Sequence, residues 1–203
     1  MNILEFTRTL IRRPSVTPDD HGCQQLIAEI LEELGFETEF LRFGEVDNLW
    51  ARRGSAAPVL CFAGHTDVVP AGPRDQWRVD PFAAEIDNGK LIARGAADMK
   101  ASLAGMLSAC ERFVTDNPEH SGSLAFLITS DEEGAAQEGT LKVMQTLTQR
   151  NESIDWCVIG EPSSKDTLGD TVRIGRRGSL TGLMAIRGAL GHVAYPLPER
   201  NPM

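Results

Sequence analysis

Four short segments of this sequence contain histidine and carboxylate side chains that could hold a metal ion. The segments are His65-Thr66-Asp67, Ala97-Asp98-Met99, Asp131-Glu132-Glu133 and Gly160-Glu161-Pro162. Imidazole nitrogen and carboxylate oxygen are ligands that suit zinc. Carboxylates gathered at one place repel one another unless a cation neutralises them or some stay protonated. If the fold brings the four segments together, their chemistry favours a metal centre.

The spacing within two of these segments allows a division of tasks. His65 and Asp67 lie two positions apart. One of them can bind the metal while the other supports it, because a carboxylate that accepts the second ring N–H of a ligating histidine fixes its tautomer. Glu132 and Glu133 are adjacent and must point in different directions. One of these can bind the metal while the other acts as general base toward a water molecule.

Each segment also has an ordinary structural explanation. Taken alone, His65 is more often a structural histidine, 131–133 is more often a solvated turn, and Asp98 could be the N-cap of a helix. Their joint occurrence beside predicted strands and a helix start favours the metal. Other catalytic motifs are absent: the sequence has no GxSxG nucleophile motif, no Walker A motif and no glycine-rich dinucleotide loop.

The hydrophobic pattern predicts the elements that must position these segments. Uniformly apolar runs predict buried strands over 59–64, 123–129 and 154–159, and alternation predicts further strands over 36–43 and 48–52. Helical spacing predicts helices over 3–11, 23–34, 98–114 and 140–147. This order indicates an α/β fold with a mostly parallel central sheet flanked by helices. Ligands bind beyond the carboxyl ends of the strands in such a sheet, so the four segments should meet at one edge.

The pattern changes after residue 175. A short alternating strand is predicted over 179–187, and no partner strand follows it in this sequence. We therefore expect one domain over 1–175, which lacks a C-terminal part, and the beginning of a second domain over 176–203.

Composition narrows the classes of partner. The 203 residues have a formal net charge of −9, and aromatic residues make up only 6%. An acidic chain without a basic stripe is a poor nucleic-acid binder, and no apolar run is long enough to span a membrane. The first residues do not resemble a signal peptide. We expect a cytoplasmic protein with a small-molecule partner, and four free, buried thiols, at Cys23, Cys61, Cys110 and Cys157.

Taken together, the motifs resemble one family of enzymes. Segments 64–70, 94–100, 129–134 and 160–162 are similar to motifs of the dinuclear zinc amidohydrolases, which include aminoacylase, acetylornithine deacetylase and glutamate carboxypeptidase. Further similar motifs lie at 12–20, 168–170, 175–180 and 191–196. The resemblance implies a zinc-peptidase-like catalytic domain, two zinc ions per subunit with Co²⁺ able to replace one, and a smaller α+β dimerisation or lid domain in a homodimer.

The resemblance also implies a role for each candidate residue. One zinc would be held by three ligands, His65, Asp98 and Glu161. Asp98 would bridge to the second zinc, which Glu133 also binds. Glu132 would be the general base, and Asp67 would support His65 from behind. The implied substrate contacts come from the end of the sequence, namely Arg176, Ser179, His192 and Tyr195. His192 would reach an active site, that of a partner subunit, and stabilise the oxyanion.

Segment 175–180 favours one substrate within the family. That substrate is N-succinyl-LL-2,6-diaminopimelate, whose amide would be hydrolysed to succinate and LL-diaminopimelate, a step towards lysine and cell-wall precursors. Deacylation of another acyl-amino acid, such as acetylornithine, is the alternative, as is a non-catalytic zinc-binding fragment. Family members are much longer and supply a further histidine ligand beyond this region. His21 and His120 do not resemble a substitute for it. The resemblance therefore implies an N-terminal portion with an exposed sheet edge that favours aggregation.

Overall fold

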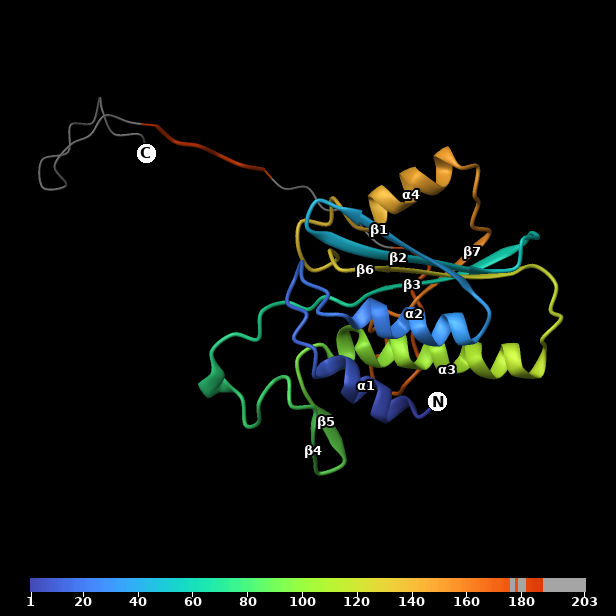
Figure 1. Ribbon diagram of the computed structural model, residues 1–203. Coiled ribbons are helices and arrows are strands. Elements are labelled where there is room, and N and C mark those ends of the chain that lie inside the picture. Colours follow the sequence, from blue (N-terminus) through green and yellow to red (C-terminus); the bar gives the residue numbers. More distant parts are fainter. Residues whose placement is uncertain (176–177, 179–181, 188–203) are drawn as a thin grey trace, which may run out of the picture. The chain divides into compact units, whose positions relative to one another are not determined.

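The computed structural model describes residues 1–175, 178 and 182–187 (Figure 1). Contacts along the chain define two units, Met1–Pro162 and Ser163–Met203, and each is considered by itself. In the second unit, the Asp170 carboxylate accepts the backbone N–H groups of Lys165, Asp166 and Thr167 and so closes a turn. The predicted domain boundary after residue 175 stays a prediction.

The first unit is built on a five-stranded sheet. Its strands, in spatial order, are β1 (Glu37–Phe43), β2 (Val46–Arg53), β6 (Ser123–Thr129), β3 (Val59–His65) and β7 (Trp156–Ile159). β6, β3 and β7 run parallel, whereas β1, β2 and β6 run antiparallel. The predicted α/β fold is confirmed, but the sheet is mixed rather than mostly parallel. Only Gly44 and Glu45 separate β1 from β2, and a parallel crossover needs a far longer connection.

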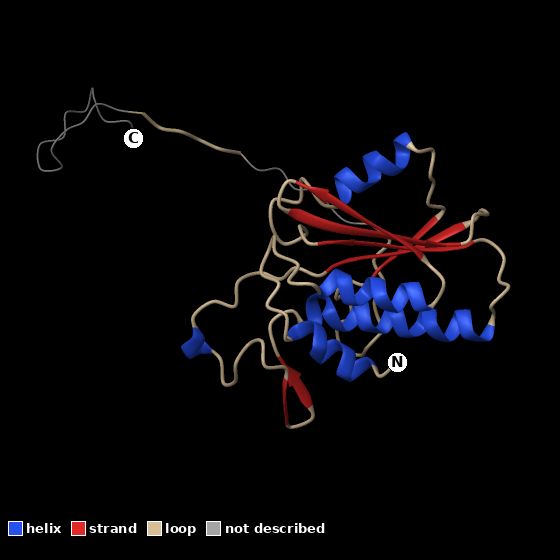
Figure 2. Cartoon of the chain, viewed as in Figure 1, coloured by secondary structure: helices blue, strands red, loops and turns tan. Residues whose placement is uncertain are grey.

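Helices cover both faces of this sheet (Figures 1 and 2). Three of them lie on one face, namely α1 (Ile3–Ile11), α2 (Cys23–Glu33) and α3 (Ala101–Asp116). Their apolar sides form the larger core cluster with the sheet, in which Phe126 of β6 is completely buried. On the other face, α4 (Thr140–Gln149) packs Val143 and Leu147 close to Trp50 of β2. β6 is therefore buried along its whole length, as its apolar sequence predicts.

The connection between β3 and α3 is long and largely irregular. It contains a short 3₁₀ turn, η1 (Arg74–Gln76), and a small hairpin made of β4 (Glu85–Asp87) and β5 (Lys90–Ile92). It ends in the turn η2 (Ala96–Lys100), which leads directly into α3. No helix among the described residues is long and apolar enough to cross a membrane.

The prediction that the third apolar strand is buried is wrong. The strand β7 forms, but all four of its residues are exposed. β7 lies at the edge of the sheet and pairs with β3 alone among the described residues, so its side chains lack the neighbours that bury β6. Cys157 is consequently exposed, whereas Cys23, Cys61 and Cys110 are buried as predicted.

The start of the predicted helix 98–114 is also wrong. α3 begins at Ala101, and Lys100 rather than Asp98 occupies the N-cap position. Asp98 has an extended backbone conformation, with φ −125° and ψ 97°. Its side chain therefore projects from the turn that precedes the helix. At the other end of α3, Phe113 is 44% exposed and does not share the buried face formed by Leu103 and Leu107.

Candidate metal centre

His65 is the last residue of β3, and its side chain is almost completely buried. Nδ1 lies 2.9 Å from the backbone carbonyl oxygen of Asp67. A carbonyl oxygen only accepts hydrogen bonds, so Nδ1 holds its proton there. Nε2 faces two carboxylates, 3.1 Å from Oδ1 of Asp98 and 3.4 Å from Oε1 of Glu161. An imidazole held at one nitrogen, with the other directed at carboxylates, is oriented as a ligating histidine is.

Asp67 lies behind this histidine, with no exposed surface. Its Oδ1 is 3.5 Å from Nδ1 of His65. The two carboxylate oxygens accept the backbone N–H groups of Glu132, at 3.3 Å, and Glu133, at 3.1 Å. Burial raises the pKa of Asp67, but hydrogen bonding to His65 and to the Glu133 N–H outweighs burial and leaves the pKa below its usual value. Asp67 therefore stays ionised and connects the segment after β3 to the segment after β6.

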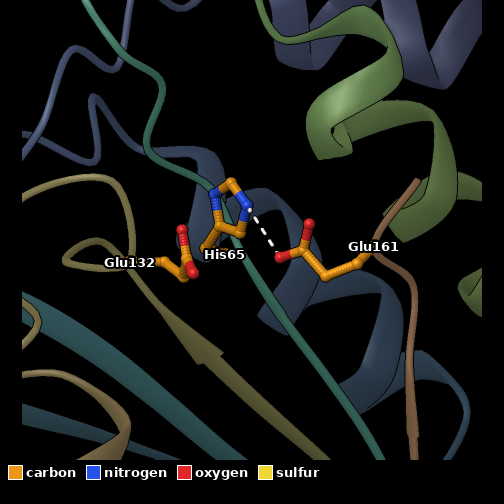
Figure 3. Close-up of side chains that lie close together, drawn as sticks. All are labelled: His65, Glu132 and Glu161. Carbon is orange, nitrogen blue, oxygen red and sulfur yellow. Dashed lines mark ion pairs between the residues drawn. The ribbon is translucent and has the colours of Figure 1, made fainter. Parts of the chain in front are cut away.

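Two overlapping groups of side chains have the geometry of a metal site. One consists of His65, Asp98 and Glu133, and the other of His65, Glu132 and Glu161. Within each group, one potential ligand atom from every residue lies within 4.8 Å of the others. Figure 3 shows the second group, with Glu132 reaching His65 from the segment after β6 and Glu161 from the segment after β7. The carboxyl ends of three parallel strands thus meet at one place, as the sequence predicts.

The charges around His65 suit a bound cation. Burial and the charge of Asp98 raise the pKa of Glu133, so its negative charge is disfavoured there. Burial lowers the pKa of His65, but hydrogen bonds and charge from Asp67, with a contribution from Glu161, raise it overall to about 9. The cluster therefore stabilises positive charge at its centre. One imidazole with several carboxylates is also a donor set that divalent zinc accepts, so these residues fit the predicted metal.

The structure brings together six of the ten predicted site residues. They are His65, Asp67, Asp98, Glu132, Glu133 and Glu161. The other four, Arg176, Ser179, His192 and Tyr195, lie outside the described residues. Which glutamate binds metal and which acts as the base stays a prediction.

The sequence did not reveal the buried residues whose hydrogen bonds hold these segments in place. Ser15, Thr66 and Lys100 are completely buried and hydrogen-bonded next to the cluster. Segment 12–20 is recognisable as a motif, but it has no periodicity that would reveal its contacts. The signal in the sequence was Lys100, which stands directly before the apolar pattern of α3. Lysine is rarely buried unless it is paired, so a lysine at this position indicates a buried partner.

The fold and this cluster are consistent with one protein family, and comparison with family models identifies it. Residues 61–198 match peptidase family M20/M25/M40, and the chain belongs to this family. The predicted family resemblance is confirmed. The chain is 60% identical over 200 residues to a succinyl-diaminopimelate desuccinylase of Acinetobacter baumannii and 62% identical over 198 residues to one of Marinobacter nauticus. Each alignment covers 98% of this chain and 53% of the relative. The chain thus spans about half the length of these curated relatives.

Solved structures support the same fold at much lower sequence identity. Human carnosine dipeptidase 1 matches with a TM-score of 0.71, and an M20 family metallo-carboxypeptidase of Sulfolobus solfataricus matches with a TM-score of 0.70. Both are 22% identical, and each match covers 80% of this chain and 38% of the other. At 22% identity, these matches show only that the fold is shared.

Proposed function

We propose that this chain supplies metal-binding and catalytic groups for the hydrolysis of N-succinyl-LL-2,6-diaminopimelate to succinate and LL-diaminopimelate. The observation that supports the chemistry is the pair of overlapping groups around His65 at the carboxyl edge of the sheet. The acyl group and amino acid follow from desuccinylase relatives at about 60% identity. The partner is a small molecule, and the reaction belongs to the cytoplasm.

The proposed metal ligands divide into two overlapping sets. His65, Asp98 and Glu161 would hold one zinc, and Asp98 with Glu133 would hold a second, which gives two zinc ions per subunit. Co²⁺ could replace one of them. A bound metal would supply Lewis acidity and lower the pKa of a water molecule. The close approach of Nε2 of His65 to Asp98 and Glu161 supports the first set.

Glu132 is the proposed general base. Its side chain is exposed, so a water molecule can reach it, and its backbone N–H is held by Asp67. Glu132 would accept a proton from the attacking water as the new carbon–oxygen bond forms. It would then return that proton to the nitrogen as the amide carbon–nitrogen bond breaks. Asp67 would hold His65 in one tautomer and orientation throughout.

The remaining proposals concern parts of the chain outside the described residues. Arg176, Ser179 and Tyr195 would contact the substrate, and His192 would stabilise the oxyanion, as a residue contributed across a homodimer. In this proposal, residues 1–175 form the catalytic domain, and 176–203 begin the dimerisation or lid domain.

Metal content is the first measurement that tests this proposal. The purified 203-residue chain would be loaded with zinc, dialysed and analysed by mass spectrometry. We expect bound zinc that is lost on His65→Ala, because this substitution removes the donor common to both groups. His120→Ala is the matched control, since His120 precedes β6 and the cluster follows its end.

Two results would contradict the proposal. The proposed metal centre would be contradicted if the wild-type chain bound no zinc or if His65→Ala retained as much zinc as the wild type. Faster cleavage of N-acetylornithine than of N-succinyl-LL-diaminopimelate would instead reject the acyl group and leave the metal chemistry in place.

A further inference from the structure

We infer that residues 13–20 form a positioning loop for the metal centre. Ser15 in this loop, and the buried Lys100 that donates to the carbonyl of Arg13 at its start, hold the metal-binding segments in place without binding metal themselves. This inference rests on the proposed function. The loop lies between α1 and α2, and it touches three separate segments that provide the proposed ligands. Nothing in the proposed chemistry uses the loop's own side chains.

The first contact is with the segment that contains His65 and Asp67. The Ser15 hydroxyl donates to the backbone carbonyl of Thr66 at 2.6 Å. The N–H of Val68 donates to the carbonyl of Ser15 at 2.8 Å, and the N–H of Thr17 donates to the carbonyl of Val68 at 3.1 Å. These bonds form a short parallel bridge along the chain just beyond β3. The backbone on both sides of Asp67 is therefore fixed by the loop.

A side-chain bond strengthens the same contact. The hydroxyl of Thr66, the residue between His65 and Asp67, donates to Oδ1 of Asp20 at 2.6 Å. Asp20 also accepts the backbone N–H of Gln24 in the first turn of α2. α2 is packed into the larger core cluster, so Thr66 is tied to a rigid helix at the end of the loop.

The second contact is with the segment that contains Asp98. Lys100 lies two residues further on and is completely buried. Its Nζ donates to the carbonyl of Leu10 at 2.9 Å and to that of Arg13 at 2.8 Å. A buried ammonium group is costly unless it is hydrogen-bonded, and carbonyls at the end of a helix are suitable partners. The turn that carries Asp98 is thereby fastened to the end of α1 and the start of the loop.

The third contact is with the segment that contains Glu132 and Glu133. The hydroxyl of Ser130, which follows β6, donates to the carbonyl of Pro18 at 2.7 Å. Ser130 also accepts the N–H of Asp47 on β2 at 3.1 Å. One loop therefore sets the spacing between three ligand-bearing segments that are far apart in the sequence.

We expect the loss of these bonds to weaken metal binding while the same side chains remain the metal ligands. Zinc ligands lie at about 2.0–2.2 Å from the ion, and sites tolerate displacements of only about 0.5 Å. Removing outer partners of metal ligands typically weakens metal binding about 10- to 100-fold. We expect a loss in this range for Ser15→Ala and for Lys100→Met.

Co²⁺ binding to the 203-residue chain tests the inference, measured by visible absorption and by competition with a chelator. Ser15→Ala and Lys100→Met should each weaken Co²⁺ affinity about 10-fold or more and change the ligand-field spectrum. Ser123→Ala is the matched control, because its buried hydroxyl also donates to a backbone carbonyl, that of Ala56, at 2.6 Å. It lies at the start of β6, away from the cluster. The control should lose thermal stability but keep the wild-type affinity and spectrum.

Wild-type affinity and spectrum in Ser15→Ala would overturn the inference, as would an equal loss of affinity in Ser123→Ala. If Lys100→Met does not fold, Ser15→Ala and Ser123→Ala decide between these outcomes. A wild-type chain that binds no Co²⁺, or that binds it equally after His65→Ala, would overturn the metal centre itself and the inference with it. Failure of the proposed metal centre would appear in the wild-type chain or in His65→Ala. Failure of the inference about the loop alone would appear only in Ser15→Ala or Ser123→Ala, so the two can be distinguished.

Discussion

At the scale of single residues, carboxylates close to His65 differ sharply in their surroundings. Asp67 is completely buried and accepts two backbone N–H groups, so its carboxylate is held in place and has no contact with solvent. Glu132 is exposed and lies in one of the two groups around His65. This contrast favours Asp67 as a fixed support and Glu132 as the proton carrier.

Glu132→Gln should separate catalysis from metal binding. The amide cannot accept the proton of the attacking water, so we expect the rate of hydrolysis by a parent chain of the relatives' full length to fall about 10²- to 10⁴-fold. Zinc content, measured by mass spectrometry, should stay at the wild-type level. Glu133→Gln is the comparison, and it should lower the zinc content instead. If Glu132→Gln loses zinc and Glu133→Gln keeps it, the two roles are reversed.

At the scale of elements, the sequence predicts most segments, and the errors lie where burial depends on distant parts of the chain. The apolar runs of β3 and β6 and the helical spacing in α1 to α4 are local properties, so their positions could be predicted. The exposure of Trp156 on β7 could not, because it is set by which strands lie beside it. The extended backbone of Asp98 was also hidden, since the helical pattern of α3 continues into the turn before it.

The site was predictable in composition but not in its internal arrangement. The placement of His65 and acidic residues after parallel strands predicts that these segments lie close together, and the structure has Glu133 in one group with His65 and Glu161 in the other. The pairing of Glu132 with Glu161 depends on side-chain directions that spacing does not define. Ser15 and Lys100 donate to backbone carbonyls. Every residue type has a carbonyl, so the sequence does not show which acceptors they bind.

An ion pair between two elements predicts a pH dependence of stability. Arg150, just after α4, contacts both carboxylate oxygens of Glu39 on β1. Hydrogen bonding to Arg150 holds the pKa of Glu39 below its usual value. A carboxylate whose pKa is lowered by folding stabilises the folded state above its unfolded pKa, and this contribution disappears as pH falls through the folded pKa.

Glu39→Gln should therefore reduce the free energy of unfolding slightly at pH 7 and not at pH 2, as measured by urea denaturation. The effect should be small, since the pair is partly exposed and screened by solvent. Glu37→Gln, at an exposed position of the same strand, is the control and should show no such difference. An equal loss for Glu39→Gln at both pH values would contradict an electrostatic origin.

At the scale of the whole molecule, β7 forms an edge of the sheet that no other described strand covers. On β7, Trp156 is 60% exposed, Val158 is 47% exposed and Ile159 is 61% exposed. Unpaired backbone groups and apolar side chains at a strand edge favour pairing with another chain. We expect the 203-residue chain to self-associate.

Val158→Lys should reduce this self-association, because a charged side chain on an edge strand opposes pairing with another chain. Sedimentation velocity and light scattering would measure the change. Leu141→Lys is the control, since Leu141 is 53% exposed on α4 and lies away from a strand edge. A monomeric wild-type chain with a sharp, cooperative thermal transition would contradict the prediction.

The parallel pairing of β3 with β7 has a consequence for the order in which the molecule acquires its metal. His65 follows β3 and Glu161 follows β7, so an ion that binds both closes a loop of roughly one hundred residues. In the unfolded chain this closure costs conformational entropy, and that cost grows with the logarithm of loop length. In the proposed site such an ion would act as a reversible cross-link, and we expect it to bind after β6 and β7 have both paired with β3. During synthesis, the proposed site would be completed only when β7 and Glu161 have emerged.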